Sequence, residues 1–165
     1  MLNNVLQRLG LMHKQVNIAL WGSDVSEMAT LVHGLQTGEY VKQEPSIHPF
    51  SQEITINNVN FTATVPSGNT GARLAWRSSL PEFDGIVYVV DTKDSSWLTV
   101  AKEELNGLLN DETLSKPILI LVAKSDPSEE AELDAITKQG PTVALYTYDK
   151  YEETKEGFQW LLQHV

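Results

Sequence analysis

The sequence predicts an α/β domain built on a six-stranded, mostly parallel sheet, with one antiparallel edge strand and helices on both faces. Two segments, 85–90 (GIVYVV) and 117–123 (PILILVA), are nearly continuous apolar runs, as expected of strands that are covered on both faces. Strand-like and helical patterns alternate along the chain, which is typical of parallel sheets. With 165 residues, of which 41% are hydrophobic, the chain is long enough to bury one core.

Each element follows from its own periodicity and turn residues. Apolar residues at helical spacing predict a short amphipathic helix within 1–14, ahead of a domain over 15–165; they are Leu2, Val5, Leu6, Leu9 and Met12. Asn57 and Asn58 tolerate positive φ and predict a hairpin turn inside 53–65. The other predicted strands are 16–21, 85–90, 117–123 and 142–147. The predicted helices are 28–37, ended by Gly38, and 96–110, 128–138 and 152–163. Residues 39–52 are expected to form a loop.

Composition excludes several classes of function. The net charge of −10 disfavours nucleic acids and anionic membranes, since both require a basic surface. The absence of cysteine excludes disulfides and cysteine-based zinc sites. No apolar stretch reaches the ~18 residues that a membrane span needs, and the N-terminus lacks the pattern of a signal peptide. We therefore expect a cytoplasmic protein without a metal site.

The stretch 21–31 (WGSDVSEMATL) lies where a strand turns into a helix, which is the setting of a phosphate-binding loop. The same residues also fit a capping box, in which Asp24 accepts from backbone N–H groups and Glu27 reaches back to the cap. In that interpretation the protein's own carboxylates replace a bound anion. Met28 and Ala29 then serve packing.

The loops after the predicted strands, and several segments between them, resemble the Arf and Arf-like family of small GTPases. The similarity runs from Val16 to Leu162 and includes Arg73, Trp76 and Arg77, which match an R-x-x-W-R pattern. The matching segments are GLQTGEYV, DGIVYVVDTKD, AKEELNGLLNDETLSKPILILVAKSD and EGFQWL. The resemblance implies a P-loop NTPase-like small G domain and a relation to vesicle trafficking.

The phosphate loop departs from the family pattern G-x-x-x-x-G-K-[ST]. Its four defined positions are Gly22, Glu27, Met28 and Ala29 in this chain, so only the first glycine is kept. The missing lysine and hydroxyl would contact phosphates and Mg²⁺ in the family. A unit charge about 5 Å from a phosphate contributes roughly 3 kcal/mol at an effective dielectric of about 20. Losing the lysine and adding Glu27 therefore disfavours nucleotide by on the order of 6 kcal/mol, or about four decades in affinity.

The other nucleotide motifs are also altered. The threonine of the first switch is Ser46, and the second switch has Val65 and Asn69 for its Asp and Gln but keeps Gly68. The base-reading N-K-x-D has Ala123 for its Asn and keeps Lys124 and Asp126. By resemblance, the residual nucleotide-binding positions are Gly22, Asp24, Ser46, Gly68, Lys124 and Asp126.

We expect a catalytically inactive Arf-like pseudo-GTPase that binds no cofactor, or GTP and GDP only weakly, and has no catalytic or metal-binding residues. Protein partners would contact the switch-like regions, including Ile47, Phe50, Arg73 and Trp76, together with the N-terminal helix. Nucleic acid is not expected, and membrane association would be peripheral, through a partner. The alternative is a divergent active GTP-hydrolysing switch with non-standard phosphate contacts.

Overall fold

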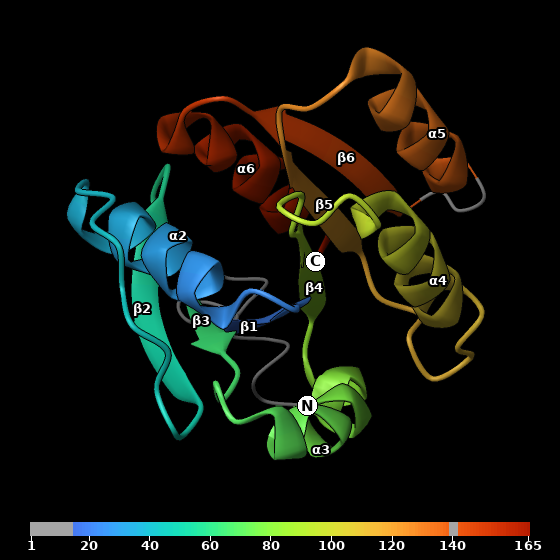
Figure 1. The fold of residues 1–165 in the computed structure, drawn as a ribbon. Coiled ribbons are helices and arrows are strands. Elements are labelled where there is room, and N and C mark those ends of the chain that lie inside the picture. Colours follow the sequence, from blue (N-terminus) through green and yellow to red (C-terminus); the bar gives the residue numbers. More distant parts are fainter. Residues whose placement is uncertain (1–14, 139–141) are drawn as a thin grey trace.

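The structure is a computed structural model that describes residues 15–138 and 142–165, and it confirms the predicted sheet (Figure 1). The strands are β1 (Val16–Gly22), β2 (Phe50–Ile56), β3 (Val59–Val65), β4 (Gly85–Val90), β5 (Ile118–Ala123) and β6 (Val143–Tyr148). Their order is β2-β3-β1-β4-β5-β6. Among the pairs of these described strands, β2–β3 is the antiparallel one and the others are parallel. The predicted helix within 1–14 lies outside the described residues.

Helices cover both faces of this sheet (Figure 1). They are α2 (Val25–Thr37), α3 (Arg73–Ser79), α4 (Trp97–Leu109), α5 (Pro127–Thr137) and α6 (Thr154–His164). Short 3-10 turns adjoin them, namely η1 (Thr70–Ala72), η2 (Leu80–Glu82) and η3 (Tyr151–Glu153). One core cluster joins the sheet to α2 and α6, and the other joins it to α3, α4 and α5.

Strand β1 illustrates how the two cores form. Ile18 and Leu20 belong to the core under α2 and α6, while Ala19 and Trp21 belong to the opposite core. This alternation follows from the two-residue period of a strand. All four side chains are at least 94% buried, as expected of a central parallel strand.

The structure corrects two predicted boundaries and adds one helix. Helix α2 begins at Val25 rather than residue 28, because Asp24 caps it. Strand β2 begins at Phe50, inside the predicted loop 39–52. Helix α3 was not predicted; it is seven residues long and has no buried residue, so it leaves little apolar periodicity. The predicted hairpin is confirmed, with φ of 50° at Asn57 and 66° at Asn58.

Candidate functional site

The predicted site residues lie at the carboxyl edge of the parallel strands, beginning with Gly22 at the end of β1. Gly22 has φ of 153°, and a Cβ there would lie 2.4 Å from the carbonyl oxygen of Val89. Only glycine fits this backbone conformation and this close approach. The Gly22 carbonyl accepts a hydrogen bond from Arg73 Nη1 at 2.6 Å. The turn of the phosphate loop is thus retained.

Asp24 caps the helix that follows. Its Oδ1 accepts from the Glu27 N–H at 3.0 Å, and its Oδ2 accepts from Lys93 Nζ at 2.9 Å. Burial by itself raises the pKa of Asp24, but the Lys93 ammonium and the Glu27 amide together hold that pKa below its usual value. A carboxylate of the chain itself therefore occupies the positive end of the α2 dipole, where an anion would otherwise bind.

Glu27 does not complete the predicted capping box, and that part of the prediction is wrong. Its Oε1 accepts from the Tyr148 hydroxyl at 3.2 Å, and its Oε2 accepts from the Tyr151 hydroxyl at 3.3 Å. Burial and then the nearby Glu27 charge raise the pKa of both tyrosines. Both phenols consequently remain protonated donors at neutral pH.

A third tyrosine extends this contact. The Tyr40 ring stacks on Tyr151, with centroids 5.3 Å apart and planes 7° apart. Tyr148 and Tyr151 are tilted by 30° at 5.9 Å. Tyr40 also lies against Gly34 in the middle of α2, where a Cβ would come within 1.9 Å of the ring. We call Glu27, Tyr40, Tyr148 and Tyr151 the tyrosine bridge.

The next two phosphate-loop positions face the core. Met28 is fully buried, and Ala29 is 2% exposed. Both belong to the cluster under α2 and α6. Their side chains pack, as the sequence predicted, and neither supplies a cation or a hydroxyl group to the carboxyl edge.

The segment 39–49, which matches the first switch, is hydrogen-bonded to α2 through the backbone of Gln43. Thr30 Oγ1 accepts from the Gln43 N–H at 3.0 Å, while Ser26 Oγ donates to the Gln43 carbonyl. Thr30 is 3% exposed and also donates to the Ser26 carbonyl at 2.8 Å. Both polar groups of the Gln43 peptide are therefore satisfied by side chains of the helix.

The same segment contacts the loop that matches the second switch. The Gly68 N–H donates to the Ser46 carbonyl at 2.7 Å, and Ser67 Oγ donates to the Ile47 carbonyl. A Cβ at Gly68 would lie 2.5 Å from Pro45 Cβ. The two switch-like segments are thus bonded directly to each other.

Val65 and Asn69, which stand at the family's Asp and Gln, are engaged elsewhere. Val65 is fully buried at the end of β3. Asn69 Oδ1 accepts from the Gly71 N–H at 3.0 Å and caps η1. Among residues 15–138 and 142–165, no group of three or more carboxylate or imidazole side chains is arranged to hold a metal ion.

The two retained base-reading residues follow β5. Asp126 caps α5, accepting from the Ser128 N–H at 2.8 Å and the Ser128 hydroxyl at 2.6 Å, and these bonds lower its pKa. The exposed Lys124 donates its N–H to the Tyr148 carbonyl at 2.8 Å. Ala123, which replaces the asparagine, ends β5.

The four residues predicted to contact partners differ in exposure. Ile47 is 76% exposed, whereas Phe50 is half-buried against the core. Trp76 Nε1 donates to the Leu20 carbonyl at 2.8 Å, which anchors α3. Arg73 is anchored as well, since its guanidinium lies 4.1 Å from the Trp21 ring centroid.

Next to these anchored residues, Leu74 on α3 is 80% exposed. The sequence did not single it out, because a seven-residue helix gives no clear apolar face. Leu74 and Ile47 are the most exposed large apolar residues of the described chain.

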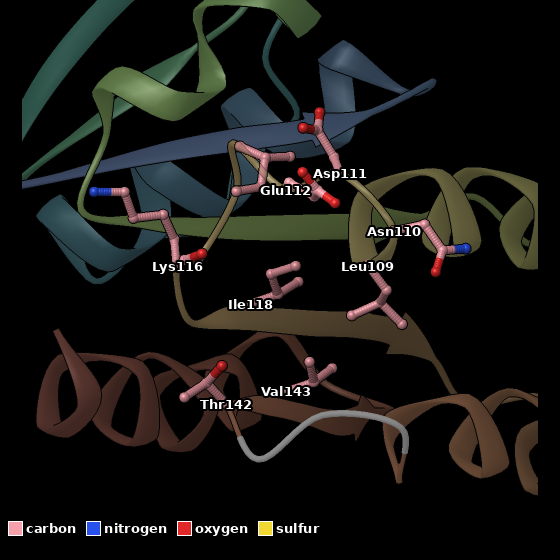
Figure 2. Close-up of a pocket in the computed structure, with 10 residues that line it drawn as sticks. Leu109, Asn110, Asp111, Glu112, Lys116, Ile118, Thr142 and Val143 are labelled. Atoms are coloured by element: carbon pink, nitrogen blue, oxygen red, sulfur yellow. The ribbon is translucent and has the colours of Figure 1, made fainter.

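Surface hollows of several sizes lie at and beside this edge. One of about 230 Å³ is lined by Ser23, Asp91 and Trp97, and one of about 430 Å³ is lined by Trp21, Arg73 and Leu74. Another, lined by Gly22, Ser23 and 66–70, measures about 50 Å³, whereas small-molecule pockets usually measure about 300–1,000 Å³. A hollow of about 300 Å³ (Figure 2) lies at the opposite edge, where Ile118 and Val143 begin β5 and β6.

A family model, the Arf (ADP-ribosylation factor) family, matches residues 2–165. The chain belongs to the Arf family. Among its relatives, ADP-ribosylation factor 1 of Brassica rapa subsp. pekinensis is 28% identical over 90% of this chain and 87% of its own. The small COPII coat GTPase SAR1B of Dictyostelium discoideum is 34% identical over 74% of this chain and 64% of its own.

A solved structure supports the same fold for this Arf-family chain. It is the Arl6 BBS3 small GTPase from Trypanosoma brucei with the bound nucleotide analogue GppNp. The TM-score is 0.71 at 20% identity, covering 91% of this chain and 96% of that chain. In the part of this chain that the structure describes, no helix has the length and apolarity to cross a membrane.

The sequence of this Arf-family chain did not point to five residues of the site, which are Tyr40, Tyr148, Tyr151, Gly34 and Gln43. Two signals were available. The tract 146–151 (YTYDKY) holds three aromatic residues near the position of the family's last base loop. Gly34 is a poor helix former in the middle of a predicted helix. Neither signal identifies a partner for Glu27, because the contact depends on the packing of distant segments.

Proposed function

We propose that this Arf-family chain is a catalytically inactive pseudo-GTPase that works as a protein-binding module or as a subunit of a larger assembly. One observation carries the proposal. At the positions where the family has its phosphate-loop glycine and lysine, the chain has a carboxylate held by two tyrosines and a fully buried methionine. Neither Glu27 nor Met28 supplies positive charge to a phosphate.

Nucleotide would also have to displace internal contacts. Binding in the family's mode brings phosphates to the start of α2, where the Asp24 carboxylate already caps the helix. Losing such a cap costs about 1 kcal/mol. Two hydrogen bonds to Glu27 and the Tyr40–Tyr151 stack add about 1 kcal/mol each. These costs come on top of the missing lysine, so tight binding of Mg·GTP is not expected.

A protein partner would bind the switch-like segments. Ile47 and Leu74 are 76% and 80% exposed, respectively. Because both segments are held by bonds within the chain, such binding would not depend on nucleotide. In this proposal the protein is cytoplasmic and reaches membranes only through its partner.

Isothermal titration with GTP and GDP, with and without Mg²⁺, tests the proposal. We expect no heat of binding up to about 100 µM ligand, which corresponds to a free energy weaker than about −5.5 kcal/mol. Arl6 from Trypanosoma brucei titrated with GppNp is the positive control, since its structure holds that analogue. Submicromolar, Mg²⁺-dependent binding by this chain would refute the proposal.

The second candidate is a divergent, active GTP-binding switch. It is favoured by Lys124 and Asp126, which are the same residue types as two of the family's base-reading residues. A purified protein that carries guanine nucleotide would support it, as would loss of binding in Asp126→Asn. Absence of nucleotide in the ultraviolet spectrum and in the extract of the denatured protein would support the first candidate instead.

A further inference from the structure

We propose that the tyrosine bridge acts as an internal ligand that fixes the conformation of segment 39–49 in the absence of any small molecule. The inference rests on the proposed loss of nucleotide binding. It adds a mechanism, because a nucleotide-free G domain needs something else to connect its phosphate loop, its first switch and its base loop.

The bridge joins these three parts through Glu27. The carboxylate lies in the first turn of α2, Tyr148 is the last residue of β6, and Tyr151 begins η3. Each carboxylate oxygen accepts from one phenol. The start of α2 and the end of β6, which nucleotide would span, are thus connected by the chain itself.

Tyr40 carries this connection into the segment. Its ring stacks on Tyr151 with nearly parallel planes. The same ring also occupies the space where residue 34 would have a Cβ. Glycine in a helix interior is less favourable than alanine, so Gly34 is explained by the ring that it admits.

Two further anchors follow Tyr40 in the sequence. The Gln43 peptide is bonded to Thr30 and Ser26, and the Ser46 carbonyl is bonded to Gly68. Tyr40, Gln43 and Ser46 follow one another at intervals of three residues, which leaves the backbone between them little conformational freedom. Exposed residues such as Val41 and Ile47 are consequently held in place without burial of their own side chains.

Hydrogen exchange of the full-length, nucleotide-free protein tests the inference. We expect Tyr151→Ala to speed exchange of the Gln43 amide and its neighbours in 39–49 by about tenfold or more, as local opening becomes easier. Amides of β4 should keep their wild-type rates. Tyr151→Phe, which keeps the stack but loses the hydroxyl, should fall between the wild type and Tyr151→Ala.

Tyr146→Ala is the matched control. Tyr146 is a half-buried tyrosine on β6 that packs against the same core and makes no hydrogen bond to Glu27 in the described residues. Unchanged exchange in 39–49 on Tyr151→Ala would overturn the inference. An equal acceleration by Tyr146→Ala, which would indicate general loosening, would also overturn it.

The same measurement with GTP and Mg²⁺ separates this inference from the proposed function. If nucleotide slows exchange in 22–30, the proposed loss of binding is wrong. The internal ligand is then still judged by the nucleotide-free samples, where Tyr151→Ala must differ from Tyr146→Ala.

Discussion

The Tyr151 hydroxyl donates a hydrogen bond to the Glu27 carboxylate at 3.3 Å, across 124 residues of sequence. Tyr148 donates to the other oxygen of the same carboxylate at 3.2 Å. The family uses this region to bind a nucleotide between its first and last loops. Here those loops contact each other, and four predictions follow from this and the neighbouring contacts.

Alanine should have opposite effects at two helical glycines. A Cβ at Gly34 would overlap the Tyr40 ring, so Gly34→Ala should destabilise the protein by about 1–3 kcal/mol. Among the described residues, nothing outside the backbone of its own helix turn and its chain neighbours lies within 4 Å of the Cβ position of Gly107 in α4. Gly107→Ala should therefore stabilise by about 0.5–1 kcal/mol. Urea denaturation measures both.

The Tyr40→Ala background checks the cause at Gly34. Without the ring, Gly34→Ala should become neutral or stabilising, which a double-mutant cycle would report as strong coupling. A destabilisation of equal size in both backgrounds would show that Tyr40 is not responsible.

Restoring the family's lysine should weaken the fold. Met28 is fully buried, so Met28→Lys places an ammonium group in an apolar core and should cost about 3–5 kcal/mol. Met28→Leu, the volume-matched control, should cost less than about 1.5 kcal/mol. Chemical denaturation measures the stability of both variants. Equal stabilities would mean that the lysine side chain of Met28→Lys reaches solvent.

The charge on Asp24 should contribute stability above about pH 4. Its pKa is lower in the folded protein than usual. Its contribution is therefore present above the unfolded pKa and is lost as the pH falls through the folded one. Asp24→Ala should cost about 1 kcal/mol at pH 7.

Asp24→Asn keeps a capping oxygen without the charge. Its stability deficit relative to the wild type should shrink between neutral pH and about pH 3. Urea midpoints at both pH values provide the measurement. A deficit that stays constant across this range would exclude the ionised carboxylate as the cause.

Substitutions of the exposed Ile47 and Leu74 should abolish binding of a protein partner without reducing the stability of the fold. Ile47→Arg and Leu74→Arg alter residues that are 76% and 80% exposed. The free energy of unfolding, measured by thermal denaturation, should therefore change by no more than about 0.5 kcal/mol. Partner proteins recovered with the wild type from its native source should be lost with both variants. Val59→Arg, on the distant β2–β3 hairpin, should retain them.

Much of the fold could be predicted because its signals are local. The runs 85–90 and 117–123 are apolar throughout and became β4 and β5. Asn57 and Asn58 marked the hairpin. Helix α3 left no such signal, since none of its seven residues is buried and Trp76 is the one α3 residue that packs against the core.

The candidate site was less predictable, because its contacts are distant in sequence. The cap at Asp24 depends on the next few residues and was predicted. The partners of Glu27 lie 121 and 124 residues away, and the local pattern pointed to a capping box instead. Gly34 could only be explained once the Tyr40 ring was seen against it.

The order of the strands has a consequence for synthesis of the chain. Strands β1, β2 and β3 emerge from the ribosome first and are neighbours in the sheet, whereas β6 emerges last and forms the far edge. Until β6 and η3 have been synthesised, Tyr40 lacks Tyr151, the ring on which it stacks. The stack of Tyr40 on Tyr151 can therefore form only after the last part of the chain has been synthesised, later than the hydrogen bonds of Gln43 to α2.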